Sequence, residues 1–244
     1  MNENEAGVGA AVARWVRAHK VWSGCIALGT CLVLEFALLP YDDVRRLKTA
    51  NPVETAFMRQ QQEDAVKDGK PFKRVQHWIG LPRIPKDAIN AVIVAEDGTF
   101  WTHKGFDWFE FRESIERNIK EGRPARGAST ITQQLVKNLY LSSSKNPLRK
   151  LNEWVLTWYM EQTLSKQRIL ELYLNVIEWG RGIYGIEAAS QQYFGKSASG
   201  ISRGEAARLA AVIPNPKLLR VDRDTRYVER RSQLILSRMA ARGL

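Results

Sequence analysis

Cysteine and histidine are scarce in this sequence, and their scarcity excludes several kinds of site. The two cysteines, Cys25 and Cys31, both lie in one apolar segment, so the rest of the 244-residue chain has no disulfide and no thiolate metal site. The three histidines, His19, His77 and His103, are far apart in the sequence. We therefore expect neither a zinc site nor a nucleophilic triad that depends on histidine.

Regular alternation of polar and apolar residues is also missing. Beyond Tyr41, no stretch of more than a few residues alternates as a half-buried strand would, and no internal repeat occurs, whereas apolar residues recur at helical spacing. The hydrophobic fraction of 44% is ample for a core. The sequence therefore predicts an all-α or nearly all-α domain.

Negative charge is in deficit. Lysine and arginine number 37 against 26 aspartates and glutamates, which gives a net charge of +11 and favours an anionic partner: nucleic acid, a membrane surface or a phosphorylated substrate. A nucleic-acid-binding module would place base-stacking aromatic residues among the basic ones. Here the aromatic residues recur at helical core spacing, as Trp108, Phe111, Ile115 and Ile119 do in an expected helix at residues 108–120. A membrane-anchored nucleic-acid-binding module is therefore the weaker alternative, and no nucleic-acid partner is expected.

One long hydrophobic run is present, at residues 21–39 (VWSGCIALGTCLVLEFALL). Its nineteen residues span about 28 Å as a helix, close to the hydrocarbon core of about 30 Å. A buried core helix and a cleaved signal peptide are the alternatives, but no A-x-A-like cleavage site follows the run. We predict a single transmembrane helix at residues 21–39, between a tail at residues 1–20 and a domain at residues 40–244.

Two adjacent carboxylates, Glu96 and Asp97, follow an apolar helix expected at residues 87–95. The negative end of the helix dipole and the apolar neighbours both disfavour ionised Glu96, so its pKa should be raised. A carboxylate with a raised pKa suits a general base near neutral pH, although a solvated helix end is the alternative interpretation. Asp97 would accept hydrogen bonds from the loop that follows. Further helix starts are marked by capping residues at Ser129 or Thr130, Asn146–Pro147, Ser165 and Ser202.

Another unusual charge pattern lies in the helix expected from Asn146–Pro147 to about Leu164. Arg149 and Lys150 occupy its first turn, where the helix dipole penalises cations by about a few tenths of a kcal/mol, and Glu153 shares their face. Two cations beside free helix N–H groups suit an anion such as phosphate, with surface ion pairing as the alternative. A pair of carboxylates is the arrangement of glycoside chemistry, and a phosphate cradle favours transfer over hydrolysis.

The helix expected to run to Leu139 has a third polar face. Gln134, Lys137 and Asn138 are spaced i, i+3 and i+4, whereas Ile131 and Leu135 belong to the core face. By itself this polar face identifies no ligand.

Five segments, in the same order along the chain, resemble the motifs of the peptidoglycan glycosyltransferases. The segment EDGTFWTHKGFD, from Glu96, is similar to E-D-x-x-F-x-x-H-x-G-x-D, GASTITQQLVKN is similar to G-x-S-T-[IL]-T-Q-Q-x-x-K-N, and RKLNE is similar to R-K-x-x-E. KQRILELYLN and GIYGIEAAS match the remaining two. The likeness is specific over residues 96–190 and weaker over residues 51–216. Because a penicillin-binding transpeptidase domain would not fit after it, the chain resembles the monofunctional enzymes.

The resemblance implies a mainly α fold similar to that of lysozyme, with a helical large lobe and a small jaw lobe near the membrane. It implies polymerisation of lipid II into β-1,4-linked glycan strands with release of undecaprenyl pyrophosphate. Membrane lipids and other cell-wall synthesis or division proteins are the implied partners. No organic cofactor is expected, and a divalent Mg²⁺ or Mn²⁺ ion is allowed. The implied location is the bacterial inner membrane with a periplasmic catalytic domain, an orientation that the flanking charges leave open.

Roles for individual residues follow from the same resemblance. Glu96 would deprotonate the 4-hydroxyl of the acceptor sugar, and Glu153, the second catalytic residue, would act with the cations on the departing pyrophosphate. The implied substrate-binding residues are Asp97, Phe100, His103, Ser129, Thr130, Gln134, Lys137, Asn138, Arg149 and Lys150. A lytic, lysozyme-like enzyme that cleaves glycan strands is the main alternative. No function is carried over to the basic tail beyond Pro216, which would lie on anionic lipid or close the domain.

Overall fold

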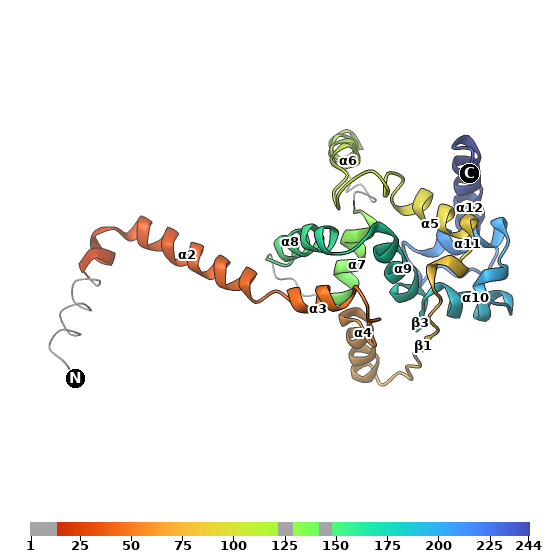
Figure 1. Ribbon diagram of the computed structural model, residues 1–244, viewed down its shortest axis with the longest axis horizontal. Coiled ribbons are helices and arrows are strands. Elements are labelled where there is room, and N and C mark those ends of the chain that lie inside the picture. Colours follow the sequence, from red (N-terminus) through yellow and green to blue (C-terminus); the bar gives the residue numbers. More distant parts are fainter. Residues whose placement is uncertain (1–13, 122–128, 142–147) are drawn as a thin grey trace. The chain divides into compact units, whose positions relative to one another are not determined.

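The computed structural model describes residues 14–121, 129–141 and 148–244, and it divides into two units, Met1–Pro40 and Tyr41–Leu244 (Figure 1). In the first unit, helix α2 (Lys20–Ala37) buries no residue and is long and apolar enough to cross a membrane. The hydroxyls of Ser23 and Thr30 donate to helix carbonyls at 3.0 and 2.9 Å, so these two polar groups are satisfied within α2.

The second unit is mainly helical, as the sequence predicts. Its helices are α3 (Tyr41–Arg46), α4 (Ala56–Lys67), α5 (Lys86–Glu96), α6 (Trp108–Glu121), α7 (Ile131–Tyr140), α8 (Leu148–Thr163), α9 (Lys166–Val176), α10 (Ile186–Phe194), α11 (Arg203–Val212) and α12 (Arg226–Ala241). The strands are β1 (Val75–Gln76), β2 (Glu178–Gly180) and β3 (Ile183–Tyr184).

The three strands form a small sheet of order β1-β3-β2, in which β1 pairs parallel and β2 antiparallel with β3. Strands of two or three residues are too short to produce an alternating pattern, which explains why the sequence did not reveal them. Gly182, in the turn between β2 and β3, has a φ of +76°, and a Cβ there would lie 2.4 Å from the Lys73 carbonyl oxygen. The turn therefore requires glycine.

Helix starts lie where the capping residues predict them. Thr130, Ser165 and Ser202 are the N-caps of α7, α9 and α11, and the first and third of these form complete capping boxes. The expected helix start at Asn146–Pro147 lies outside the described residues, and α8 is described from Leu148. These caps determine where α7 begins, and the start of α7 is part of the site described below.

The core surrounds α7, which packs against α4, α8 and α9, while α5 packs against α11 and α12. Ile131, Leu135 and Leu139, the predicted core face of α7, are all buried. Among the described residues, Trp179, Tyr173 and Tyr184 are the largest side chains that are fully buried. This packing brings the C-terminal end of α5 beside both α7 and α12.

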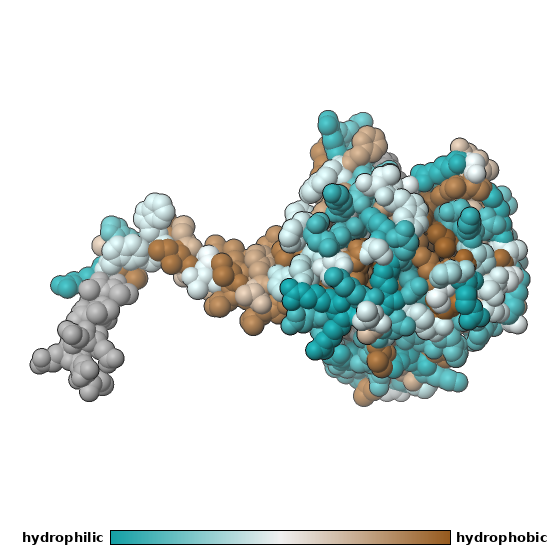
Figure 2. All heavy atoms as spheres, in the orientation of Figure 1, coloured by the Kyte–Doolittle hydropathy of each residue, from teal (hydrophilic) through white to brown (hydrophobic). Residues whose placement is uncertain are grey.

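The apolar row of α6 is not core, so the interpretation of its spacing was wrong. Trp108, Phe111, Ile115 and Ile119 are 62%, 38%, 43% and 77% exposed. Helix α6 projects from the body of the second unit (Figure 1). Hydrophobic residues lie on its exposed surface (Figure 2). Helical periodicity identifies an apolar face but does not say whether another element of the chain covers it.

Candidate active site

Glu96 is the last residue of α5, and its side chain is only 10% exposed. One carboxylate oxygen, Oε2, accepts a hydrogen bond from Gln134 Nε2 at 3.0 Å, and the other, Oε1, lies 3.2 Å from Arg231 Nη2. Burial raises the pKa of Glu96 above its ordinary value, although the Gln134 hydrogen bond and the Arg231 charge oppose the rise. The upward direction of the Glu96 pKa shift, which the sequence predicts, is confirmed.

The orientation of the Gln134 amide is fixed from behind by Tyr173. The Tyr173 hydroxyl donates to Gln134 Oε1 at 2.8 Å, so the amide nitrogen of Gln134 faces Glu96. Burial, and then the negative charges of Glu96 and Asp97, raise the pKa of Tyr173 well above its ordinary value, which keeps the hydroxyl protonated. A hydrogen-bond relay therefore runs from α9 through α7 to the end of α5.

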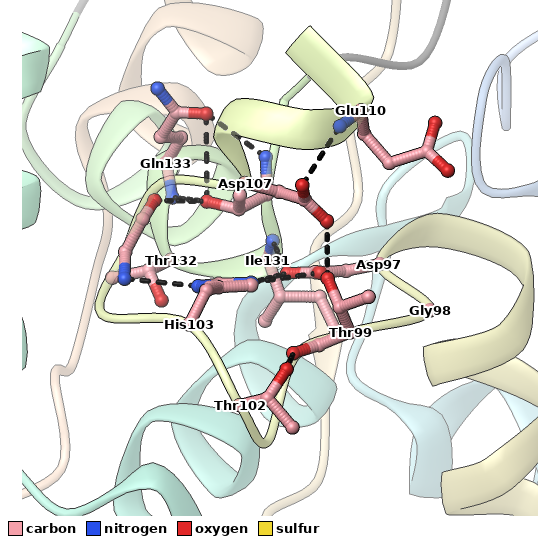
Figure 3. Close-up of polar contacts among 12 residues, drawn as sticks. Asp97, Gly98, Thr99, Thr102, His103, Asp107, Glu110, Ile131, Thr132 and Gln133 are labelled. Atoms are coloured by element: carbon pink, nitrogen blue, oxygen red, sulfur yellow. Dashed lines mark hydrogen bonds and ion pairs between the residues drawn. The ribbon is translucent and has the colours of Figure 1, made fainter. Parts of the chain in front are cut away.

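Asp97 joins three segments of the chain (Figure 3). Its carboxylate lies 2.9 and 3.0 Å from His103 Nε2, and Oδ2 also accepts from the backbone N–H of Ile131, at the start of α7, at 2.8 Å. His103 Nδ1 accepts from the Gly105 N–H at 3.0 Å, so the ring proton lies on Nε2 and is donated to Asp97. The loop after α5 therefore bonds Asp97, as expected, and α7 is an additional partner.

The loop at residues 98–107 is held by further hydrogen bonds, one buried and two exposed. The Thr130 hydroxyl donates to the Gly105 carbonyl at 2.8 Å, and the Thr99 hydroxyl bonds the Asp107 carboxylate, which also accepts from the Glu110 N–H at the start of α6 at 2.8 Å. Phe100 is completely buried, with the Lys166 ammonium 4.4 Å from its ring centre.

These contacts give four expected substrate-binding residues a structural role. Asp97, Phe100, His103 and Thr130 hold the loop and the start of α7, and their contact with substrate stays a prediction. A motif does not distinguish a residue that contacts the substrate from one that shapes the loop around it.

The second carboxylate, Glu153, lies on α8 with its side chain 4% exposed. It forms an ion pair with Lys150, and its Oε2 lies 3.8 Å from Arg149 Nη1. The shared face predicted by the spacing is confirmed, and Glu153 is an anion that both cations face in the structure. Because 3.8 Å is longer than a hydrogen bond, that contact does not use up the donors of the Arg149 guanidinium.

A pocket of about 80 Å³ adjoins Lys150. Its lining comes from the start of α6, the start of α7 and the first turns of α8, and consists of Phe106, Asp107, Trp108, Phe111, Ser129, Gln133, Lys150 and Trp154. The rings of Phe106 and Trp108 stack with their centres 5.5 Å apart. The pocket therefore combines four aromatic rings with a cation, a carboxylate, a hydroxyl and an amide. The sequence interpretation assigned no role to its Phe106 and Trp154, although both lie in or beside the quoted motifs.

The remaining expected site residues are less directly connected. Ser129 lines the same pocket as Lys150, and Asn138 donates to the backbone carbonyl of Gln134 at 2.8 Å. Lys137 is exposed on α7. Within the part of the chain that is described, no group of three His, Cys, Asp or Glu side chains could hold a metal ion. Glu153, a carboxylate that could contact a divalent ion, already faces Lys150 and Arg149, and the Mg²⁺ or Mn²⁺ ion that the resemblance allows stays a prediction.

Sequence reasoning also missed Tyr173 and Arg231, the two residues that contact Gln134 and Glu96 from α9 and α12. Helix α12 packs against α5 and α11, so the basic tail closes the domain, which was one of the two expected roles. Arg242, near the end of the chain, donates to the Gly98 carbonyl oxygen at 2.8 Å. A basic segment rich in arginine carried no signal that distinguished Arg231 from its neighbours.

The fold and the site together define a class of protein: a helical enzyme with one buried carboxylate at the end of an apolar helix and another beneath two cations, an arrangement suited to chemistry at a glycosidic bond. A family model described as transglycosylase matches residues 63–240. The chain belongs to the transglycosylase family, whose domain is lysozyme-like, as the sequence resemblance implies.

Relatives in several bacteria are similar over most of their length. The chain is 44% identical over 195 residues to a biosynthetic peptidoglycan transglycosylase of Herminiimonas arsenicoxydans, covering 80% of this chain and 84% of that protein. Identity to the protein of that description in Methylobacillus flagellatus is 46% over 190 residues, covering 78% and 82%. For Thiobacillus denitrificans the identity is 46% over 217 residues, covering 86% and 90%.

Proposed function

We propose that this protein is a peptidoglycan glycosyltransferase that polymerises lipid II into β-1,4-linked glycan strands. The observation that carries the proposal is Glu96, a buried carboxylate with a raised pKa, held by Gln134 beside the loop that Asp97 organises. Membership of the transglycosylase family and the names of the relatives support the same reaction.

In this reaction Glu96 is the general base. It takes the proton of the acceptor sugar's 4-hydroxyl, and that oxygen attacks the anomeric carbon of the growing chain. The bond from the anomeric carbon to the pyrophosphate oxygen breaks, its electron pair leaves with undecaprenyl pyrophosphate, and the configuration inverts from α to β. Gln134 holds one carboxylate oxygen in place, so the base is oriented before the acceptor binds.

Arg149 and Lys150 act on the leaving group. Negative charge grows on the pyrophosphate as it departs, and the two cations stabilise that charge most strongly in the transition state. Glu153, buried beneath them, holds both cations at the start of α8. The aromatic pocket beside Lys150 suits the first apolar units of a lipid carrier, while the ammonium faces its phosphate.

The anchor and α6 fit an enzyme whose substrate is carried on a lipid. Helix α2 is long and apolar enough to span a bilayer, and α6 exposes Trp108, Phe109 and Ile119. We assign α6 to the small lobe that contacts the membrane. A single-pass inner-membrane protein with a periplasmic catalytic domain is the localisation that follows from this proposal.

A lytic enzyme is the second candidate, because a carboxyl with a raised pKa also suits a general acid in glycan hydrolysis. The cations on α8 weigh against it, since hydrolysis of a lipid-free strand releases no phosphate. Incubation of the purified protein with lipid II, and separately with preformed lipid-free glycan strands, distinguishes the two. Polymer from lipid II and intact strands support the transferase, whereas cleaved strands and unreacted lipid II would reject it.

A further inference from the structure

Arg231 connects the end of the chain to the catalytic base. Its Nη2 lies 3.2 Å from Glu96 Oε1 and 3.5 Å from the Ala95 carbonyl oxygen, across 135 residues of sequence. It lies on α12 between Val228 and Ile235, both of which are buried, so the packing of α12 determines its position. We propose that Arg231 is a positioning residue for glycosyl transfer: its guanidinium orients the Glu96 carboxylate and favours its ionised form. This inference rests on the proposed function.

The contact differs from an ordinary surface ion pair. The Arg231 side chain is 28% exposed and the Glu96 side chain 10% exposed, so water screens the pair only in part. Arg231 Nε is buried and finds no hydrogen-bond partner among the described residues, which is unfavourable for stability. The placement brings a guanidinium to the base.

Among the described residues, Arg231 is the cation that faces Glu96. Asp97 adjoins Glu96 just after the end of α5 and Tyr173 faces it from α9, while α7 contributes the neutral Gln134 amide. Helix α11 also packs against α5, but its Arg203 lies 3.6 Å from Asp87 at the opposite end of that helix. Burial and Asp97 both raise the pKa of Glu96, and Arg231 is the charge that opposes them.

The reaction needs both the burial that raises the pKa of Glu96 and the Arg231 charge that lowers it. A carboxylate whose pKa is raised binds a proton more strongly, but it must be ionised before it can accept one. Arg231 favours the ionised form of the base, against the burial that favours its protonated form. Because each carboxylate oxygen has two lone pairs, Arg231 and the acceptor hydroxyl can both contact Oε1.

The test compares full-length Arg231→Gln, Arg231→Lys and Arg230→Gln proteins, the last being the exposed neighbour on the same helix. The pH dependence of kcat/KM for lipid II polymerisation is measured for each. Loss of the Arg231 charge raises the pKa of Glu96, so the acid limb of Arg231→Gln should move to higher pH. Arg231→Lys should return the limb toward its wild-type position, and Arg230→Gln should leave it unchanged.

A second measurement does not depend on polymerisation. The ¹³C chemical shift of the Glu96 carboxyl, assigned by its loss in Glu96→Gln, is titrated in the substrate-free protein. An upward shift of that titration in Arg231→Gln supports the inference even if lipid II proves to be the wrong substrate. If Arg231→Gln shifts neither the acid limb of the kcat/KM profile nor the Glu96 carboxyl titration, the inference is overturned, whatever the loss of activity. Arg231 would then be a purely structural residue.

Discussion

The two carboxylates of the site are held by opposite kinds of structure. The cations beside Glu153 come from its own helix, three and four residues earlier. The groups that hold Glu96 come from α7 and α12, 38 and 135 residues away. The surroundings of Glu153 therefore form with α8 itself, whereas those of Glu96 depend on the packing of the whole second unit.

The two carboxylates therefore have their charge environments set in two different ways. At Glu153 a local charge pattern keeps two cations at a helix start. At Glu96 burial raises the pKa, and an amide and a guanidinium from distant helices oppose that rise. Substitutions far from the chemistry should therefore affect the base end of the site more than the donor end.

The largest effect is expected at the base itself. In Glu96→Gln the amide keeps the size of the carboxylate but takes no proton, so polymerisation of lipid II should fall about 10²–10⁴-fold. Circular dichroism and thermal unfolding should show an intact domain. Activity within about tenfold of wild type would remove Glu96 from the role of base.

The donor end should respond next most strongly. Arg149→Ala should lower kcat about 10²-fold, and more than it raises KM, because the lost contact strengthens as pyrophosphate departs. Arg149→Lys should restore only part of kcat, since lysine lacks the planar fork of donors. Arg59→Ala, a change of the same kind at an exposed arginine of α4, is the control. A rise in KM without a fall in kcat would contradict the assignment to the leaving group.

The relay behind Gln134 gives a smaller effect. Tyr173→Phe removes the hydroxyl that fixes the amide, so the free energy of unfolding should fall by about 1 kcal/mol and kcat should fall severalfold. Tyr184→Phe is the matched control: that hydroxyl is also buried, but it has no partner among the described residues. Its removal should leave both quantities unchanged or raise stability. Equal effects of the two substitutions would mean that the relay does not orient the base.

Removal of residues 1–40 should have the smallest effect on the chemistry. The second unit, Tyr41–Leu244, has its own core, so the truncated protein should fold and polymerise lipid II in detergent at a rate near that of the full chain. With lipid II in vesicles it should be slower, because the anchor no longer holds the enzyme at the substrate. An insoluble or unfolded product would show that α2 belongs to the core.

What the sequence could predict follows the same division between local and distant contacts. The N-caps at Thr130 and Ser202, and the face shared by Arg149 and Glu153, depend on spacing within one helix, and all were predictable. The contact of Arg231 with Glu96 depends on how α12 packs, and no local pattern records it.

The exposed α6 and the roles of the motif residues show the same limit. The spacing of Trp108 and Phe111 identified an apolar face but not its exposure. The role of Phe100 and His103 in supporting the loop likewise depends on what encloses them, which the motif does not record.

The most direct test of the central claim, that the two carboxylates serve opposite ends of the reaction, is the pH profile of kcat/KM for Arg149→Ala against wild type. Glu96 must be ionised to act, so activity falls as the pH falls through its raised pKa. The account predicts that Arg149→Ala lowers the plateau and leaves the acid limb where it is, because the limb belongs to Glu96. A limb that moves with the loss of Arg149 would contradict it, since the cation would then be acting on the base.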